Sequence, residues 1–297
     1  MILNRANLSV LFQGYKLAFQ QAFDGAPSYW QQIATLVPSN TSEEAYPWLG
    51  QTTQFREWIG ERVYQSLKLH GYRIKNKTFE NTISVPRDAI EDDQYGVYSP
   101  MIRQLGQDSK EHPDLLIFKL LQEGFATPCY DGQYFFDTDH PVGMDGSVQS
   151  VSNFQGGSGR PWFLLDTSRH IKPLILQKRR EYNLVSRTNP ETDEKCFDFN
   201  EFVYGVDGRL NVGFGLWQLA FASREALDSA SFNDVYAQMS AFKGDSGKPL
   251  GIRPKLLLVG PQDRAKALEV VKAERSANGA TNINRDVVDV LDVPWLA

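Results

Sequence analysis

Two carboxylates and an imidazole stand close together in Asp137-Thr-Asp-His140, and such groups are common ligands of metal ions. Ligands from one short loop usually need a further ligand from elsewhere, and Asp145 and His170 are the nearest candidates. A turn in which the Asp side chains accept hydrogen bonds from backbone amides explains the same residues without a metal. We therefore predict no metal and no cofactor, with a metal-dependent hydrolase using Asp137, Asp139 and His140 as the alternative.

The segment Gly244-Asp-Ser-Gly-Lys-Pro249 differs by one residue from the nucleophile loop of chymotrypsin-like proteases. All four histidines of the chain precede it, which is the order found in those enzymes. However, Lys248 replaces the glycine that should follow, and the loop lies between a predicted helix and a predicted strand rather than in a β-barrel. Because a triad is defined by geometry and not by a fragment of sequence, we predict a connecting loop, no catalytic residue, and a protein that is not an enzyme.

Length and composition are those of a globular protein with a sizeable core. The chain has 297 residues, 41% hydrophobic and 23% charged, which suffices for one large or two modest domains. Its only cysteines, Cys129 and Cys196, cannot build a disulfide framework or a structural zinc site, so we expect free thiols. The chain has no apolar run of ~20 residues and no signal-peptide pattern, so we expect no membrane partner and a cytoplasmic protein. A net charge of −5 argues against a broad DNA-binding face.

The elements that would position these residues are organised around one stretch, Gly71–Gly124. It begins with an extended run over Tyr72–Val85, where alternate side chains fall on opposite sides, as in a half-buried strand. A helix is then predicted from an N-cap at Ser99 to a C-cap at Gly124. Because Pro113 lies inside it, we expect either one long kinked helix or two helices that meet just before the proline.

An amphipathic helix with several aromatic residues is predicted ahead of this stretch, from a cap at Asn7 to Gly25. Its apolar stripe can be buried within its own subunit or on a neighbouring one. Residues 26–48 are predicted to form an arm with short extended pieces. Residues 50–72 mix apolar and charged side chains between glycines, and periodicity alone does not separate an extended loop from a short surface helix.

Two long extended segments follow, Trp162–Val185 and Phe197–Phe221, and we expect them to form an antiparallel sheet beneath the long helix. Within the second, Tyr204–Arg209 is predicted to make a tight turn or a charged strand end. From Arg224 onward the pattern changes to helix, strand, helix, strand, which is typical of a compact α/β unit. The first of these helices is predicted to be capped by Ser231.

Several blocks of sequence, in order along nearly the whole chain, resemble the Mu-like phage major head subunit (gpT) family. The blocks are Gly71-Tyr-Arg-Ile-Lys-Asn-Lys-Thr-Phe-Glu80, Ile90-Glu-Asp-Asp-Gln-Tyr-Gly-Val-Tyr98, Cys129-Tyr-Asp-Gly-Gln-Tyr-Phe-Phe-Asp-Thr-Asp-His-Pro141, Trp162-Phe-Leu-Leu-Asp-Thr-Ser-Arg169, Lys172-Pro-Leu-Ile-Leu-Gln177 and Pro249-Leu-Gly-Ile-Arg-Pro254. The resemblance implies an α+β fold of the tailed-phage capsid (Hong Kong 97) type. It would divide the chain into an N-terminal arm (1–48), an extended loop with its strands (49–86), a peripheral domain (87–222) with a spine helix at about 97–124 and an antiparallel sheet, and an axial domain (223–297).

The resemblance also implies a function, that of the major capsid protein of a Mu-like tailed phage or prophage. Such a subunit would form hexamers and pentamers of an icosahedral shell, would be assembled in the host bacterial cytoplasm and would become part of the virion. Its expected partners are copies of itself, a scaffolding protein, a portal, a decoration protein as a further candidate, and double-stranded DNA packaged without sequence-specific binding. A cargo-holding nanocompartment shell of the same fold is an alternative. The predicted intersubunit contacts are Phe12, Tyr15, Phe19, Phe23, Phe55, Arg56, Glu57, Trp58, Glu61, Arg62, Leu67 and Lys68.

Overall fold

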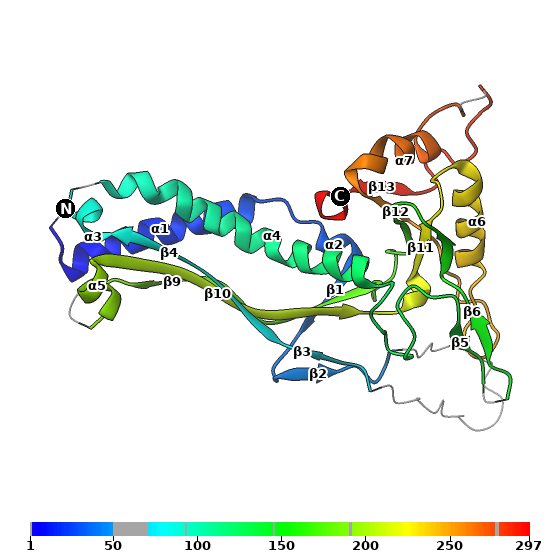
Figure 1. The fold of residues 1–297 in the computed structure, drawn as a ribbon, viewed down its shortest axis with the longest axis horizontal. Helices are drawn as coiled ribbons and strands as arrows, with labels where there is room; N and C mark the ends of the chain where they lie inside the picture. Colours follow the sequence, from blue (N-terminus) through cyan, green and yellow to red (C-terminus); the bar gives the residue numbers. More distant parts are fainter. Residues whose placement is uncertain (1, 50–70, 93, 145, 190–191, 277–278) are drawn as a thin grey trace.

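The computed structural model describes residues 2–49, 71–92, 94–144, 146–189, 192–276 and 279–297. The protein is elongated and combines helices with two main sheets, so the predicted α+β class is confirmed (Figure 1). We call the narrow end, which carries α3 (Arg87–Glu91) and α5 (Glu194–Phe199), the distal end. The opposite end, which carries α6 (Ser229–Ser240) and α7 (Arg264–Val271), is called the broad end.

A four-stranded sheet in the order β1-β9-β10-β4 runs along the elongated part. The β1 strand is parallel to β9, and the other neighbours are antiparallel. The strand predicted over Tyr72–Val85 is divided into β3 and β4, and its alternation is confirmed in β4, where Phe79 and Ile83 are half-buried and Val85 is buried. The bounds are β1 (Ala34–Pro38), β3 (Arg73–Lys75), β4 (Lys77–Pro86), β9 (Leu174–Arg187) and β10 (Glu201–Phe214).

The turn predicted at Tyr204–Arg209 is wrong, because β10 continues through it. Phe202, Tyr204 and Val206 are buried while the residues that alternate with them are only half-buried, as a strand with one covered face requires. The glycines suggested a turn, but one of them serves packing: a Cβ on Gly208 would lie 2.5 Å from a ring carbon of Tyr182 on β9. The pairing of β9 with β10 also shifts register beside this glycine, between Asp207 and Leu210.

Two long helices, α1 (Arg5–Gly25) and α4 (Ser99–Glu123), pack together over one face of this sheet (Figure 1). They approach closely at Gly106, where a Cβ would lie 2.5 Å from the carbonyl oxygen of Phe19. A larger residue at this position would push the helices apart. Among the described residues, no helix is both long and apolar enough to cross a membrane.

The ends of these helices differ slightly from prediction. The cap of α1 is Asn4, whose side chain accepts the backbone amide of Asn7 at 2.8 Å, so the helix begins earlier than expected. The α4 helix is continuous through Pro113 and ends at Glu123, with Gly124 as its C-cap as predicted. Ser99 is its first residue rather than its cap.

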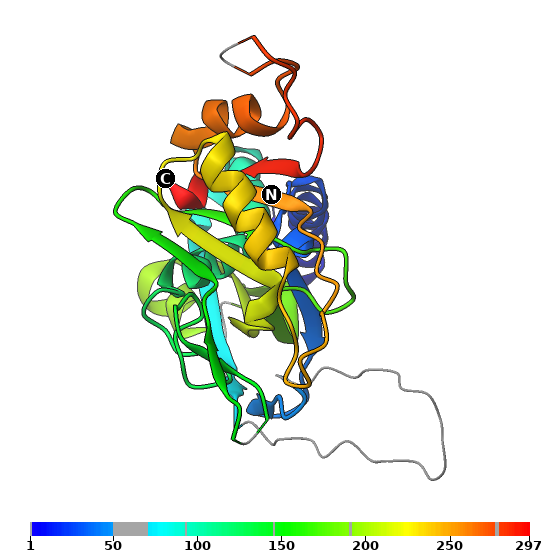
Figure 2. The same ribbon diagram turned by 90° about the vertical axis from the view of Figure 1, so that its right-hand side faces the viewer.

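The broad end is built on a five-stranded sheet in the order β13-β12-β8-β11-β7 (Figure 2). The α6 and α7 helices pack against its strands. The predicted succession after Arg224 is confirmed as α6, β12, α7 and β13. The strands are β7 (Phe154–Gly157), β8 (Trp162–Leu165), β11 (Ala220–Arg224), β12 (Leu256–Val259) and β13 (Asp289–Asp292).

Two predictions for this region are wrong. The extended segment predicted over Trp162–Val185 is divided between the sheets: β8 joins the five-stranded sheet, and only β9 pairs antiparallel with β10 as expected. The cap of α6 is Asp228 rather than Ser231, because the Asp228 carboxylate accepts the amides of Ala230 and Ser231.

The five-stranded sheet also spans the boundary predicted at residue 222, since β7 and β8 precede it and β12 and β13 follow it.

The remaining elements are short. The segment predicted as an arm contributes β1 to the edge of the four-stranded sheet, in addition to a helical turn and a strand that pairs with β3. The short elements are α2 (Trp30–Ile33), β2 (Glu43–Ala45), β5 (His140–Val142), β6 (Gln149–Val151), and the 3-10 turns η1 (Gln94–Tyr98), η2 (Trp217–Leu219), η3 (Pro261–Asp263) and η4 (Pro294–Leu296).

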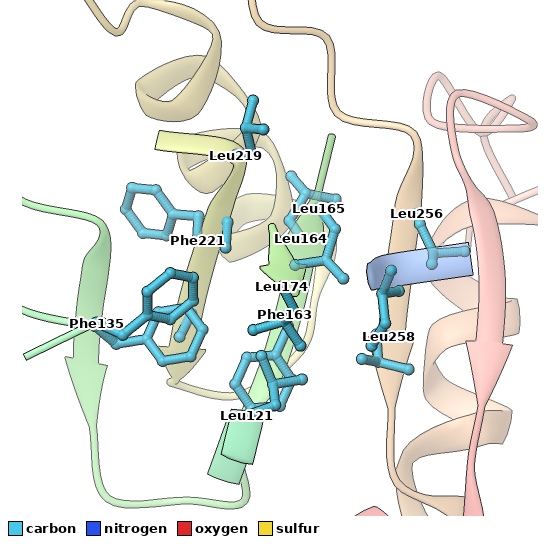
Figure 3. Packing of buried hydrophobic residues seen from close by; sticks show 14 of the residues in the cluster. Leu121, Phe135, Phe163, Leu164, Leu165, Leu174, Leu219, Phe221, Leu256 and Leu258 are labelled. Atoms are coloured by element: carbon cyan, nitrogen blue, oxygen red, sulfur yellow. The ribbon is translucent and has the colours of Figure 1, made fainter. Parts of the chain in front are cut away.

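The described residues form two hydrophobic cores, and α4 joins them. The larger, the broad-end core, surrounds the five-stranded sheet and includes Ile117, Phe118 and Leu121 from the second half of α4; Figure 3 shows part of it. The smaller, the distal core, includes Ile102 and Leu105 from the first half of α4. Its buried members are Leu8, Leu11, Tyr15, Ala18, Phe19, Val85, Ile90, Ile102, Leu105, Leu184, Cys196, Phe202, Tyr204 and Val206.

Candidate assembly surfaces and a buried polar cluster

The four aromatic residues of α1 that were predicted to contact neighbouring subunits divide into two pairs. Tyr15 and Phe19 are buried in the distal core with only 2% of their surface exposed, so the prediction is corrected for these two. The ring of Tyr15 meets Tyr204 edge-on at 5.1 Å. The apolar stripe of α1 is covered by its own subunit, because α1 packs on α4 and on the four-stranded sheet. Phe12 and Phe23 lie half-buried at the margin of the same core, and their contact with a neighbour stays a prediction.

The other predicted contacts lie outside the described residues and stay predictions. They are Phe55, Arg56, Glu57, Trp58, Glu61, Arg62, Leu67 and Lys68.

Large apolar side chains are exposed at both ends of the molecule, and none of them was among the predicted contacts. At the distal end, Phe197 and Phe199 on α5 are 84% and 60% exposed, and Val97 in η1 is 71% exposed. At the broad end, Ile283 is 80% exposed between α7 and β13. Two phenylalanines within the charged segment Glu194–Phe199 were a detectable signal only once the segment is known to be helical, because side chains two residues apart point to different sides of a helix and cannot both be buried on one face. Large exposed apolar side chains that gather at one place favour an interaction surface.

Asp137, Asp139 and His140, considered as metal ligands, are not brought together as a site, and His170 is exposed; Asp145 lies outside the described residues. Asp137 accepts the backbone amides of Tyr134 at 3.2 Å and Thr138 at 2.8 Å, so the turn predicted for this segment is confirmed. Asp139 is exposed, whereas His140 is fully buried with its ring directed elsewhere.

His140 belongs instead to a buried polar cluster, which we call the His140 cluster: Cys129, Asp131, His140, Asn153 and Trp217. The His140 Nδ1 atom lies 2.7 Å from Asp131 Oδ2, and Nε2 lies 3.2 Å from Asn153 Oδ1. The imidazole stacks on Trp217 with ring centroids 4.0 Å apart and planes 11° from parallel. The Cys129 thiol donates to Asp131 Oδ1 at 3.0 Å.

The sulfur, oxygen and nitrogen of Cys129, Asp131 and His140 lie within 4.8 Å of one another, but hydrogen bonds already engage all three. Burial and the neighbouring Asp131 carboxylate raise the pKa of the Cys129 thiol well above its usual value, so this group is a thiol rather than a thiolate. Burial acts to raise the pKa of Asp131, but hydrogen bonds from His140 and Cys129 outweigh it and hold the pKa below its ordinary value. We interpret the cluster as a hydrogen-bonded structural element.

The protease-like segment forms a loop between α6 and β12, as predicted. A hydrogen bond from the Gly244 amide to the Lys248 carbonyl oxygen, at 2.9 Å, closes the loop. The Asp245 carboxylate accepts the Gly143 amide at 3.1 Å across a groove of about 480 Å³. Both ring nitrogens of His140 are engaged by the His140 cluster, so this histidine cannot activate the serine of the loop.

These features describe a structural subunit, with a hydrogen-bonded His140 cluster in its core and large apolar side chains exposed at its ends. A family model described as the Mu-like prophage major head subunit gpT matches residues 8–296. The chain belongs to this family. It is 39% identical over 294 residues to the major capsid protein of Escherichia phage Mu, covering 97% of this chain and 96% of that protein. It is 42% identical over 287 residues to the Mu-like prophage FluMu major head subunit of Haemophilus influenzae, covering 94% and 93%.

Solved structures give the same result for the fold. The procapsid of bacteriophage JBD30 matches with a TM-score of 0.89 and 47% identity, over 99% of this chain and all of that chain. The capsid of the same phage matches with a TM-score of 0.81 and 37% identity, over 100% of both chains. The predicted tailed-phage capsid fold is therefore confirmed. This gpT-family chain is a major head subunit that assembles into capsid shells and forms part of the virion; it is a structural protein, not an enzyme.

Proposed function

We propose that the subunit forms hexamers and pentamers of an icosahedral shell, with its broad end around the capsomer axes and its distal end where capsomers meet. The observation that carries this proposal is the exposure of large apolar side chains at both ends of an elongated subunit, Phe197 at one and Ile283 at the other. Each would be buried on a neighbouring copy, which removes apolar surface from water. A subunit with one end at a capsomer axis must direct its other end toward neighbouring capsomers.

The division into domains is part of the same proposal. Residues 1–48 would form the arm, 49–86 the extended loop and its strands, 87–222 the peripheral domain and 223–297 the axial domain. Because β7 and β8 share a sheet with β12 and β13, we assign these two strands to the axial unit in space although they precede it in sequence. The residues from Phe55 to Lys68 are proposed to contact the adjacent subunit, on the strength of their mixed apolar and charged sequence.

The proposed partners beyond the shell itself are a scaffolding protein, a portal, a decoration protein and packaged double-stranded DNA, with assembly in the host cytoplasm. A JBD30 capsid decorated with minor capsid protein trimers, similar to this chain at a TM-score of 0.78 and 37% identity, supports a decoration partner. The similarity to chains of both a JBD30 procapsid and a JBD30 capsid supports a precursor shell built before maturation. The net charge of −5 supports packaging without strong adhesion to DNA.

Expression of the subunit, alone and with the neighbouring phage head genes, tests the proposal. Electron microscopy of the purified material should show closed icosahedral particles, with two-dimensional classes of hexameric and pentameric units. Mass spectrometry of the particles would identify any protein inside them. Monomers under both conditions would contradict the proposal, as would particles filled with an enzyme cargo, the latter favouring the nanocompartment.

A further inference from the structure

Asn153 determines which form of His140 fits the cluster. The amide nitrogen of Asn153 donates to backbone carbonyl oxygens, among them those of Phe135 at 2.8 Å and Ala220 at 3.2 Å. Its Oδ1 accepts the backbone amide of Asp137 at 2.9 Å, so the orientation of the side-chain amide is fixed. The atom that faces His140 Nε2 is therefore an oxygen, which only accepts hydrogen bonds, and Nε2 must carry a hydrogen.

The other ring nitrogen faces Asp131. Oδ1 of this carboxylate accepts the Cys129 thiol at 3.0 Å and the Gln133 amide at 3.1 Å, while Oδ2 lies 2.7 Å from His140 Nδ1. Because Oδ1 accepts two donors and Oδ2 is directed at the ring nitrogen, the group has the hydrogen-bond pattern of a carboxylate, and a carboxylate only accepts. Nδ1 must therefore carry a hydrogen too.

We propose that His140 is a doubly protonated imidazolium, paired with the Asp131 carboxylate, and that this pair is a proton-dependent lock holding residues 129–153 on the broad-end core. The side chain of His140 is completely buried and that of Asp131 is 6% exposed, so a lone charge on either would be costly, whereas the pair is neutral. The Trp217 ring lies flat against the imidazolium, an arrangement that favours a cation over a neutral ring.

The groups around the pair agree with this assignment. Cys129 is a thiol and contributes no charge, and Tyr130 is uncharged because burial raises the pKa of its hydroxyl, which donates to Gln218 at 3.0 Å. Asp137 directs its carboxylate to backbone amides rather than to the ring, and Asp139 is exposed. The η2 turn contributes Trp217, and the chain between β6 and β7 contributes Asn153, neither of which titrates.

The lock opens as the pH rises. An unfolded histidine loses its proton near pH ~6.5, whereas the folded protein retains it, so folding takes up a proton above that pH. By linkage, stability then decreases with rising pH, until the pair itself gives up the proton. Asp131 then loses a donor while buried, and residues 129–153 should separate from the core before the whole subunit unfolds.

Magic-angle-spinning NMR of assembled protein labelled with ¹⁵N at histidine tests the protonation state directly. At about pH 8, above the ordinary range of histidine, both ring nitrogens of His140 should carry hydrogen. His112 is an internal control, because burial lowers its pKa and it should have one bare nitrogen. Replacing His70, His112 and His170 by Gln, one at a time, assigns His140 without altering it. A bare nitrogen on His140, or a stoichiometric metal bound to it, would overturn the proposal.

The lock itself is tested by the pH dependence of melting. From about pH 7 to pH 9, the melting temperature of the native subunit should fall by several degrees, and protease should begin to cut within residues 129–153. Asp131→Asn removes the carboxylate and should melt at a lower temperature that barely changes over this range. Asp137→Asn, in the same loop but without contact to the ring, should keep the native slope. A flat native profile, or equal slopes for the native and Asp131→Asn proteins, would contradict the lock.

Discussion

The two cores of this subunit are completed in different ways. The broad-end core surrounds a five-stranded sheet and also uses the C-terminal turn, where Trp295 stacks on Phe118 of α4 with ring centroids 5.4 Å apart. The distal core is smaller, and the N-terminal helix supplies one side of it, with Tyr15 and Phe19 fully covered. An apolar helical stripe that could have served a neighbouring subunit is thus used to close the subunit itself. The ends of the molecule, where Phe197 and Ile283 are exposed, are therefore the surfaces that we compare for contacts with neighbours.

Removing residues 1–25 should have the largest effect, because it uncovers the distal core. Five buried side chains of α1 would be lost from that core, namely Leu8, Leu11, Tyr15, Ala18 and Phe19. We expect a subunit that aggregates, or whose distal half is rapidly digested by protease. Removing only residues 1–3, which precede the Asn4 cap, is the control and should change little. A soluble, protease-resistant truncation that merely fails to assemble would show that α1 packs on a neighbour.

Substituting one phenylalanine in each core should show whether the two cores unfold independently. Phe19→Ala and Phe118→Ala each remove a fully buried ring, which typically costs about 3–5 kcal/mol. We expect hydrogen exchange to accelerate only around α1, η1 and α5 for Phe19→Ala, because the distal core can open locally. Phe118→Ala should accelerate exchange across β8, β11 and β12 and lower the global melting temperature. Identical exchange maps for the two variants would mean that the cores unfold as one unit.

The two cores also show what the sequence could and could not predict. The α4 helix and β12 were predicted because spacing and end signals within each segment are sufficient. The glycines of β10 were misread as a turn because the ring that requires Gly208, that of Tyr182, comes from another strand. Periodicity identified the apolar stripe of α1 but carries no information about which partner covers it.

The His140 cluster was missed for a related reason. Asp137 and Asp139 were considered because they adjoin His140 in sequence. Its actual partners are Asp131, nine residues earlier, and Asn153, thirteen residues later. The chain brings the first into place through a turn at Gly132, whose φ of +92° favours glycine, and the second through the β5–β6 pair.

The junction between the cores should be weakened by acid, through His112. This residue of α4 accepts the Tyr182 hydroxyl at Nδ1, at 2.5 Å, beside a cavity of about 200 Å³, and burial lowers its pKa. The unfolded chain binds a proton below pH ~6.5 while the folded chain resists it, so this contribution is fully present above that pH and is lost as the pH falls. His112→Gln should reduce the acid-side slope of stability measured by urea unfolding, whereas the exposed His170→Gln should not. Equal slopes for both variants would exclude His112 as the source.

Substitutions of the exposed apolar residues at the two ends should have the smallest effect on the stability of the subunit. Their effect on assembly should be large. Phe197 and Ile283 are 84% and 80% exposed, so replacing either by Asp should change the free energy of unfolding by less than about 0.5 kcal/mol. In a shell, however, each new carboxylate would be buried against another copy without a partner, which is strongly unfavourable.

The two variants should therefore fail at different stages. Ile283→Asp should leave monomers, because it disrupts the broad end proposed to surround the capsomer axis. Phe197→Asp should still form hexamers and pentamers that do not join into closed shells. Analytical ultracentrifugation and electron microscopy distinguish these products, and Ile283→Leu and Phe197→Leu are matched controls that keep an apolar side chain and should assemble. If the two Asp variants stop at the same stage, the ends do not have separate roles; if both form normal shells, neither residue lies in an interface.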